Sequence, residues 1–547
     1  MGRRTVQVLC LLGLVVGLGL TWWLPNPVLN PVPSIQAQAR PLPFTDVNPL
    51  GANFFLDREV ETWKKRETLR MARAAGLGWV KQMFPWDQIE PQRGLFWDDR
   101  IRRSTWDKFD EVVDLVEQYG LRLIVRLDQP PEWARSRGEN ARYPVRDLNE
   151  FGDYVARVVA RYRGRVQYYQ IWNEPNLARE WGGRPPDPVA YTELLKVAYQ
   201  RAKAVDPNVV ILSAPLAQTL ERSPQAINEL DFLQGMYAAG AAPYFDILMA
   251  NAYGFDRPPE DPPDPRVLNF QRLKLLREVM VRNGDGAKPI WLNEFGWNAA
   301  PPTFPSFRLY WGRVTEEEQA AYTVRAIRLA RQWEWLGVIN LWYFRQVGDI
   351  SPLDSAEYYF RVVDPDFTPR PLYFAVQQLS EEFKFALPGE HQETSPAVQT
   401  EGRWAYVRSD EASARGYVES SAPGARLVFN FRGTGVELVP GPGAGRVYVQ
   451  LDGHPVSGLP TDPTGQTWLD LAPDVPGRPI TVARGLSYGQ HRLTLTVPQL
   501  RPAERVSIDA FVVLLEEPDY RPALLGAGLA ALSFLGLGLT FLPRRTP

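Results

Sequence analysis

The feature that most constrains the fold is a series of eight apolar runs, each of strand length and separated from the next by a longer stretch with amphipathic helical character. Strands that alternate with helices imply a parallel sheet, because parallel neighbours need a crossover connection. Eight such units predict an α/β protein whose sheet closes into a (β/α)8 barrel. The predicted strands lie at residues 51–56, 79–85, 122–127, 166–172, 209–214, 245–250, 289–293 and 337–343.

The C-terminal part of the sequence has a different pattern. From about residue 402 it consists of short alternating strands with Gly and Pro turns, which predicts an all-β sandwich. A chain of 547 residues is long enough for both domains to have their own cores. The predicted segments are a terminal helix at 1–25, a Pro-rich linker at 26–43, the barrel at 44–388, the sandwich at 400–517 and a second terminal helix at 521–542.

Apolar runs at residues 6–24 and 522–542 occupy the two ends of the chain. Each has the length of a membrane-spanning helix, and arginines flank its outer end. We therefore predict a transmembrane helix at each end, with the large domains on the extracytoplasmic side. The first run could instead be a signal peptide cleaved after Ala39, which would leave only the C-terminal anchor.

The composition of the barrel excludes several kinds of chemistry. Residues 41–388 contain neither His nor Cys, which excludes Ser-His-Asp and Cys-His catalysis as well as zinc or haem ligation by these residues. Magnesium or calcium bound by carboxylates stays open, and we predict no cofactor. The formal net charge of -2 gives no reason to expect nucleic acid as a partner. The sequence does not specify the oligomeric state.

Two glutamates end strands of the predicted barrel. Glu174 follows the strand at 166–172, which cannot continue because Pro175 has no amide donor. Glu294 follows the strand at 289–293, shortly before Gly296 breaks the pattern. Cleavage of a glycosidic bond needs one carboxylic acid to protonate the leaving oxygen and one carboxylate on the other face of the sugar. Two glutamates on strands of one barrel favour this pair over unrelated surface carboxylates.

The sequences Trp172-Asn-Glu-Pro175 and Trp291-Leu-Asn-Glu-Phe-Gly296 resemble those of the retaining glycoside hydrolases of clan A, and of family 39 in particular. The resemblance covers roughly residues 48–383 and implies a (β/α)8 barrel. It implies that Glu174 is the acid/base, that Glu294 is the nucleophile, and that Asn173 binds the sugar 2-hydroxyl. The C-terminal sandwich resembles the jelly-roll accessory modules of carbohydrate enzymes.

The same resemblance implies further substrate-binding residues at the strand ends. Tyr253 would donate a hydrogen bond to the nucleophile, and Trp342 would lie beneath the sugar. Trp297, just beyond Glu294, is a further candidate.

Two candidates depart from the pattern of the clan. Asn251 stands where a His is common, and Lys81 stands where many relatives have an Arg that contacts the nucleophile. An ammonium group at Lys81 would keep Glu294 ionised but could not contact both of its oxygens, and Arg126 could supply the charge instead.

The predicted function is therefore a retaining O-glycoside hydrolase that acts on an extracellular oligo- or polysaccharide, with carbohydrate as its substrate partner and a membrane contact through the terminal helices. The departures at Lys81 and Asn251 motivate an alternative, a non-catalytic polysaccharide-binding or export protein built on a glycosidase-like barrel. The sequence does not specify the sugar, the linkage, or endo or exo action.

Overall fold

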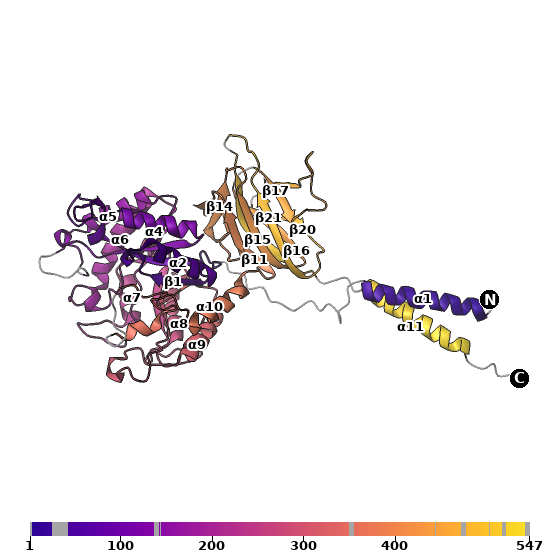
Figure 1. The fold of residues 1–547 in the computed structure, drawn as a ribbon, viewed down its shortest axis with the longest axis horizontal. Helices are drawn as coiled ribbons and strands as arrows, with labels where there is room; N and C mark the ends of the chain where they lie inside the picture. The colour runs from indigo at the N-terminus through magenta and orange to yellow at the C-terminus, as the bar shows by residue number, and fades with distance from the viewer. Residues whose placement is uncertain are drawn as a thin grey trace.

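The computed structural model describes residues 3–23, 42–135, 142, 144–348, 355–442, 445–471, 477–502, 504–516 and 521–541. Figure 1 shows a barrel domain, a β-sandwich beside it, and a pair of helices formed by the two ends of the chain. The predicted linker at 26–43 lies almost entirely outside the described residues.

The barrel consists of one eight-stranded parallel sheet in the order β7-β6-β5-β2-β1-β10-β9-β8. A parallel bridge between Leu212 and Ile247 joins the two ends of this order. The eight-stranded parallel barrel predicted from the apolar runs is confirmed. Its strands are β1 (Leu50–Phe54), β2 (Trp79–Pro85), β5 (Arg122–Asp128), β6 (Tyr168–Ile171), β7 (Val210–Leu212), β8 (Leu248–Tyr253), β9 (Ile290–Gly296) and β10 (Leu336–Leu341).

Amphipathic helices cover the outside of the barrel. Helix α4 shows the pattern, since Phe109, Val112 and Val116 are buried while the opposite side is polar. Side-chain hydrogen bonds cap the N-termini of several helices. One example is the capping box of Thr315 and Glu318 at α9. The helices of this domain are α2 (Thr62–Ala74), α3 (Trp86–Ile89), α4 (Asp107–Gln118), α5 (Leu148–Arg161), α6 (Pro188–Val205), α7 (Glu229–Ala238), α8 (Leu273–Arg282), α9 (Glu316–Ala330) and α10 (Pro371–Ser380).

Aromatic side chains close the N-terminal end of the barrel interior. Tyr168 lies 5.0 Å from Trp79 and 5.2 Å from Trp291, measured between ring centroids. Phe44, just before β1, packs on this group, and its carbonyl accepts a hydrogen bond from Trp291. The interior is therefore filled at this end, and polar side chains can gather only toward the carboxyl ends of the strands.

The second domain consists of two antiparallel sheets that enclose their own apolar core. One sheet has the order β13-β14-β22-β16-β20 with β11 beside β22, and the other has the order β12-β15-β21-β17-β18 with β19 beside β17. The strands are β11 (Gly389–Gln392), β12 (Val398–Glu401), β13 (Ala405–Arg408), β14 (Gly416–Ser420), β15 (Arg426–Gly433), β16 (Gly435–Pro440), β17 (Arg446–Leu451), β18 (His454–Pro455), β19 (Trp468–Asp470), β20 (Ile480–Ala483), β21 (Gly489–Thr496) and β22 (Val506–Leu514).

The sandwich contacts the N-terminal end of the barrel. Arg408 pairs with Asp246, which precedes β8, at 2.8 Å, and Tyr406 packs on Phe44. The amide of Gln392 donates to Asp46, which precedes β1, at 2.9 Å. The sandwich therefore lies at the end of the barrel opposite the carboxyl ends of the strands.

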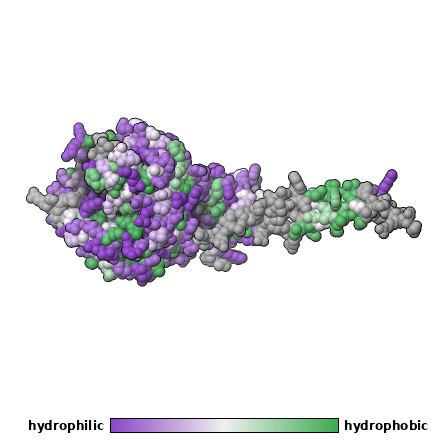
Figure 2. All heavy atoms as spheres, turned by 90° about the horizontal axis from the view of Figure 1, so that it is seen from below, coloured by the Kyte–Doolittle hydropathy of each residue, from purple (hydrophilic) through white to green (hydrophobic). Residues whose placement is uncertain are grey.

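The two terminal helices, α1 (Arg3–Trp23) and α11 (Arg521–Phe541), pack against each other in antiparallel directions. Contact is close at Gly17, where a Cβ atom would lie 2.6 Å from the carbonyl oxygen of Gly526. Figure 2 shows hydrophobic atoms along this pair. Within the described ranges, no helix has both the length and the apolar character needed to cross a membrane, so the two predicted transmembrane helices are not supported.

Candidate active site

Glu294 reaches the inside of the barrel because of an irregularity in β9. The register with β8 pairs Ala250 with Leu292 but Asn251 with Glu294, so β9 has one extra residue, Asn293, at this point. Such a bulge changes the face to which the following side chain points. The side chain of Asn293 donates a hydrogen bond to Asn251 at 2.8 Å and is buried next to the bulge.

Glu174 lies in a strained segment that follows β6. Trp172 has a φ of 72° and Glu174 a φ of 41°, both in the left-handed region that costs a non-glycine residue about 1 kcal/mol or more. Hydrogen bonds hold the segment in place: the amide of Glu174 donates to Pro215, and the side chain of Asn176 donates to Ala217 at 2.9 Å. Strain that the surroundings maintain is typical of functional sites.

One amide nitrogen links the two glutamates. Nδ2 of Asn251 lies 2.7 Å from Oε1 of Glu174 and 3.4 Å from Oε2 of Glu294. Tyr253 adds a hydrogen bond from its hydroxyl to Oε2 of Glu294 at 2.8 Å. Asn251 is almost completely buried beneath the two carboxylates. The predicted catalytic pair and two of the predicted substrate-binding residues therefore form one hydrogen-bonded group.

The environments of the two carboxyl groups favour the protonated form of Glu174. Burial, followed by repulsion from Glu294, raises the pKa of Glu174 to about 8. Arg179, 3.7 Å from Oε2 of Glu174, acts in the opposite direction but does not compensate for burial. Burial and the charge of Glu294 raise the pKa of Tyr253 well above its usual value, so this hydroxyl keeps its proton to donate. At neutral pH the site can supply a proton from Glu174.

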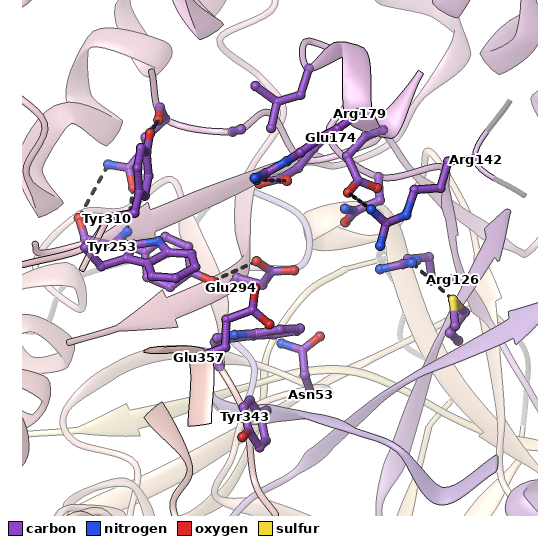
Figure 3. A pocket seen from close by; sticks show the side chains of 18 of the residues that line it. Asn53, Arg126, Arg142, Glu174, Arg179, Tyr253, Glu294, Tyr310, Tyr343 and Glu357 are labelled. Carbon is purple, nitrogen blue, oxygen red and sulfur yellow. Dashed lines mark hydrogen bonds and ion pairs between the residues drawn. The ribbon is translucent and has the colours of Figure 1, made fainter. Parts of the chain in front are cut away.

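Glu174, Glu294, Tyr253 and Arg179 line a cavity of about 600 Å3 at the carboxyl ends of the strands, whereas the predicted substrate-binding residue Asn251 is buried behind the carboxylates and does not line it (Figure 3). Asn173, Trp342 and Lys81 of the predicted set also line it. The buried amide oxygen of Asn173 and the indole nitrogen of Trp342 have no hydrogen-bond partner among the described residues. Buried groups of this kind are usually satisfied by water or a ligand. In the same part of the chain, no three His, Cys, Asp or Glu side chains gather into a metal site.

Lys81 lies in the cavity, but its contacts differ from the predicted ones. Its ammonium group donates to Oδ1 of Asn53 at 2.8 Å. Burial, followed by repulsion from Arg126, lowers the pKa of Lys81 to about 7, so much of its charge is lost near neutral pH. Arg126 stays charged and pairs with Asp128 at 2.8 Å. The permanent positive charges near the glutamates therefore include Arg126, which interacts with Glu294, and Arg179 beside Glu174.

Trp297 is not brought to the cavity. Its ring is fully buried and packs on Gly254, where a Cβ atom would lie 1.9 Å from it. Its indole nitrogen donates to the carbonyl of Arg257 at 2.8 Å. The backbone beyond Gly296 turns this side chain into the helical layer, so the predicted substrate contact of Trp297 is replaced by a packing role.

Several residues that line the cavity carry no sequence signal. Glu357 lies on the 3-10 helix Ala356–Phe360, and Tyr310 lies in the loop between β9 and α9. Burial, followed by the charge of Glu294, raises the pKa of Glu357. Both residues lie in long connections between regular elements, where neither strand periodicity nor a sequence motif indicates which way a side chain points. A prediction based on strand ends could have included Asn53, because it lies next to the last residue of β1.

The sequence matches no family model and no curated protein. The structure is similar to a family 39 glycoside hydrolase from Bacteroides cellulosilyticus WH2, with a TM-score of 0.47 and 18% identity over 84% of this chain and 82% of that chain. It is similar to a family 39 β-xylosidase from Caulobacter crescentus, with a TM-score of 0.46 and 15% identity over 85% and 98% of the two chains. A GH5_18 protein from Streptomyces cattleya, in complex with GlcNAc, matches with a TM-score of 0.46 and 16% identity over 63% and 84%. Family 39, which the two glutamate motifs resemble, is thus among the matches.

Proposed function

We propose that this protein is a retaining O-glycoside hydrolase that acts on an oligo- or polysaccharide. The observation that carries the proposal is the amide nitrogen of Asn251, which lies within reach of both carboxylates. One nitrogen in contact with both places their oxygens no more than about 6 Å apart, near the roughly 5 to 5.5 Å typical of retaining enzymes and below the ~6.5 to 9.5 Å typical of inverting ones.

In the first step, Oε of Glu294 attacks the anomeric carbon and forms a covalent ester. The bond between this carbon and the leaving oxygen breaks, its electron pair stays on the oxygen, and Glu174 supplies the proton. The raised pKa of Glu174 suits this role because the group still has its proton at neutral pH.

In the second step, Glu174 accepts a proton from water while the water oxygen attacks the same carbon. The bond to Glu294 then breaks, and the sugar leaves with its original anomeric configuration. Tyr253 stabilises the carboxylate of Glu294 before the first step and after the second through its hydrogen bond.

The test is hydrolysis by the full chain of a panel of aryl β-glycosides and polysaccharides, with Glu174→Ala and Glu294→Ala as variants. We expect turnover by the wild type, loss in Glu294→Ala, and partial recovery of Glu174→Ala with azide on substrates whose leaving group needs no proton. Proton NMR of the product should detect the sugar with its original anomeric configuration before it detects the other anomer. Retention on an immobilised polysaccharide without turnover would favour the non-catalytic binding protein instead.

The location of the protein is part of the proposal. We propose the membrane-associated, extracytoplasmic location predicted from the ends of the sequence. Apolar side chains on α1 and α11 are exposed on the outside of the helix pair, among them Leu12, Leu525 and Phe534. Cell fractionation, with protease digestion of intact cells, tests it: recovery of the chain in the soluble cytoplasmic fraction would contradict this location.

A further inference from the structure

The two glutamates give the cavity two sides. In Figure 3, Arg179 lies beside Glu174 above Glu294, and Tyr310 lies to the left of them, also above Glu294, whereas Glu357 and Asn53 lie below it. The hydroxyl of Tyr310 is within electrostatic reach of Glu174 and Arg179. In the proposed reaction the leaving oxygen takes its proton from Glu174, so the leaving group must lie on the side of that residue. The residues there would contact the group that leaves, and not the sugar that becomes bonded to the enzyme.

Tyr310 presents an aromatic ring on this side of the cavity. Its hydroxyl donates to the carbonyl of Gln218 at 3.2 Å, and its ring has an edge contact with Phe255 at 6.0 Å between centroids. These contacts fix the ring, yet 59% of the residue is exposed. Burial of the hydroxyl, followed by the charge of Glu174, raises the pKa of Tyr310, which agrees with a position near the acid/base.

The neighbouring aromatic residue has a different environment. The ring of Trp311 contacts Tyr253 at 5.6 Å and Phe360 at 5.4 Å, so it belongs to the cavity wall. Of the two adjacent rings, Tyr310 is the more exposed and offers more surface to a ligand.

Arg179 supplies hydrogen-bond donors on the same side of the cavity as the ring of Tyr310. Arg179 is 68% exposed and lies within 3.7 Å of Glu174, so its remaining N–H groups are available to hydroxyls of a ligand on this side. An exposed aromatic ring beside hydrogen-bond donors matches a sugar unit, which has an apolar face and a rim of hydroxyl groups. A cavity of about 600 Å3 lies in the range that accommodates ligands larger than one sugar ring.

We propose that Tyr310 and Arg179 form a binding subsite for the sugar that leaves, so that the bond cleaved joins two sugars. This inference rests on the proposed function and deepens it by naming the residues that bind the leaving sugar. An alcohol or a small aglycone would leave this side of the cavity unfilled. A sugar acceptor that enters the same subsite would react in the reverse direction: its hydroxyl attacks the anomeric carbon, the bond to Glu294 breaks, and Glu174 takes the hydroxyl proton.

The experiment separates the two sides of the cavity. The full chain is first trapped with 2-deoxy-2-fluoro-β-D-xylosyl, glucosyl or mannosyl fluoride, whose small leaving group does not use the subsite, and labelling of Glu294 is verified by peptide mass spectrometry. After excess reagent is removed, reactivation is followed in buffer, in azide, and in xylobiose, cellobiose or mannobiose. We expect a disaccharide to reactivate the wild type about fivefold faster than buffer does, because stacking contributes about 1 kcal/mol.

The variants test the assignment to Tyr310. Tyr310→Ala should be trapped at the wild-type rate, which shows a folded site, and should respond normally to azide, but it should lose most of the acceleration by disaccharide. Tyr310→Phe should keep the acceleration because it keeps the ring. Phe307→Ala is the matched control, since Phe307 is an 87% exposed aromatic residue in the same loop that does not line the cavity.

Wild-type enzyme that is trapped but not accelerated by any disaccharide would overturn the subsite. Tyr310→Ala that is accelerated as strongly as the wild type would overturn the role of Tyr310. If no reagent labels Glu294, the proposed function fails and the subsite fails with it, an outcome that differs from trapping without acceleration.

Discussion

At the scale of single residues, the site depends on how a few polar groups share their hydrogen bonds. Asn251 was a departure from the clan pattern in the sequence and a reason to consider a binding protein. In the structure its amide contacts Glu174 and Glu294 together and accepts a bond from Asn293. An amide can donate to both carboxylates without adding a charge, so the departure is compatible with the proposed chemistry.

The hydrogen bond from Tyr253 to Glu294 should contribute directly to catalysis. A hydrogen bond to a charged group is worth about 1.5 to 3 kcal/mol, so Tyr253→Phe should lower kcat/KM by about ten- to a hundredfold. Tyr343→Phe is the matched control, because the hydroxyl of Tyr343 lies by the same cavity without a hydrogen-bond partner among the described residues. Equal losses in the two variants would argue against a specific role for the Tyr253 bond.

The pKa of Glu174 predicts the alkaline limit of activity. The proposed first step needs protonated Glu174, so kcat/KM should fall as the pH rises through about 8. Repulsion from Glu294 is the second cause of the raised pKa, so Glu294→Gln should move the titration of Glu174 to lower pH. Carbon-13 NMR of the Glu174 carboxyl group in wild type and variant measures this shift. An unchanged titration would show that the two carboxyl groups do not interact.

At the scale of elements, the sequence predicted where strands end but not how their side chains point. The apolar runs and Pro175 were enough to place Glu174 beyond a strand. The inward direction of Glu294 depends on the extra residue in β9, and the periodicity of a single strand does not show its register with a neighbour. The predicted substrate contact of Trp297 was wrong for the same reason. Tyr310 and Glu357 come from long loops, whose path is decided by packing that the sequence pattern does not report.

The contact between β13 of the sandwich and the barrel should affect stability but not catalysis. Arg408 pairs with Asp246 at the N-terminal end of the barrel, and Asp246 also pairs with Lys203 at 2.9 Å. Arg408→Ala should lower the free energy of unfolding by about 1 to 3 kcal/mol, because it leaves a buried carboxylate with fewer partners.

In the same variant, kcat/KM should stay at the wild-type value, since the cavity lies at the other end of the strands. Urea denaturation and steady-state kinetics on one preparation separate the two effects. Arg501→Ala, at an 87% exposed side chain of the sandwich, is the control for surface substitutions. A loss of activity in folded Arg408→Ala would show that the domain contact is coupled to the site.

At the scale of the whole molecule, the cavity and the contact with the sandwich lie at opposite ends of the barrel. The barrel interior is filled at its N-terminal end, and the sandwich covers that end through Gln392, Tyr406 and Arg408. Among its described residues, the sandwich therefore contributes no side chain to the cavity that holds Glu174 and Glu294. Because the sandwich contacts the closed end of the barrel, the stability of the two domains should depend on their shared surface.

That shared surface includes an ion pair whose pH dependence can be predicted. His391 lies 3.5 Å from Asp46, and both side chains are largely buried. Burial lowers the pKa of His391 but its interaction with Asp46 outweighs this and raises it from 6.5. Burial likewise raises the pKa of Asp46, but His391 and nearby Arg331 outweigh this and lower it from 3.8.

The contribution of His391 is complete below pH 6.5 and is lost as the pH rises through its raised pKa, whereas that of Asp46 is complete above pH 3.8 and is lost as the pH falls through its lowered pKa. The pair should therefore stabilise the protein between these two values. His391→Gln should lower the free energy of unfolding by about 1 kcal/mol more at pH 5.5 than at pH 9. His454→Gln, at an exposed residue of β18, should show no such difference. Equal destabilisation by His391→Gln at both pH values would mean that His391 acts through packing and not through its charge.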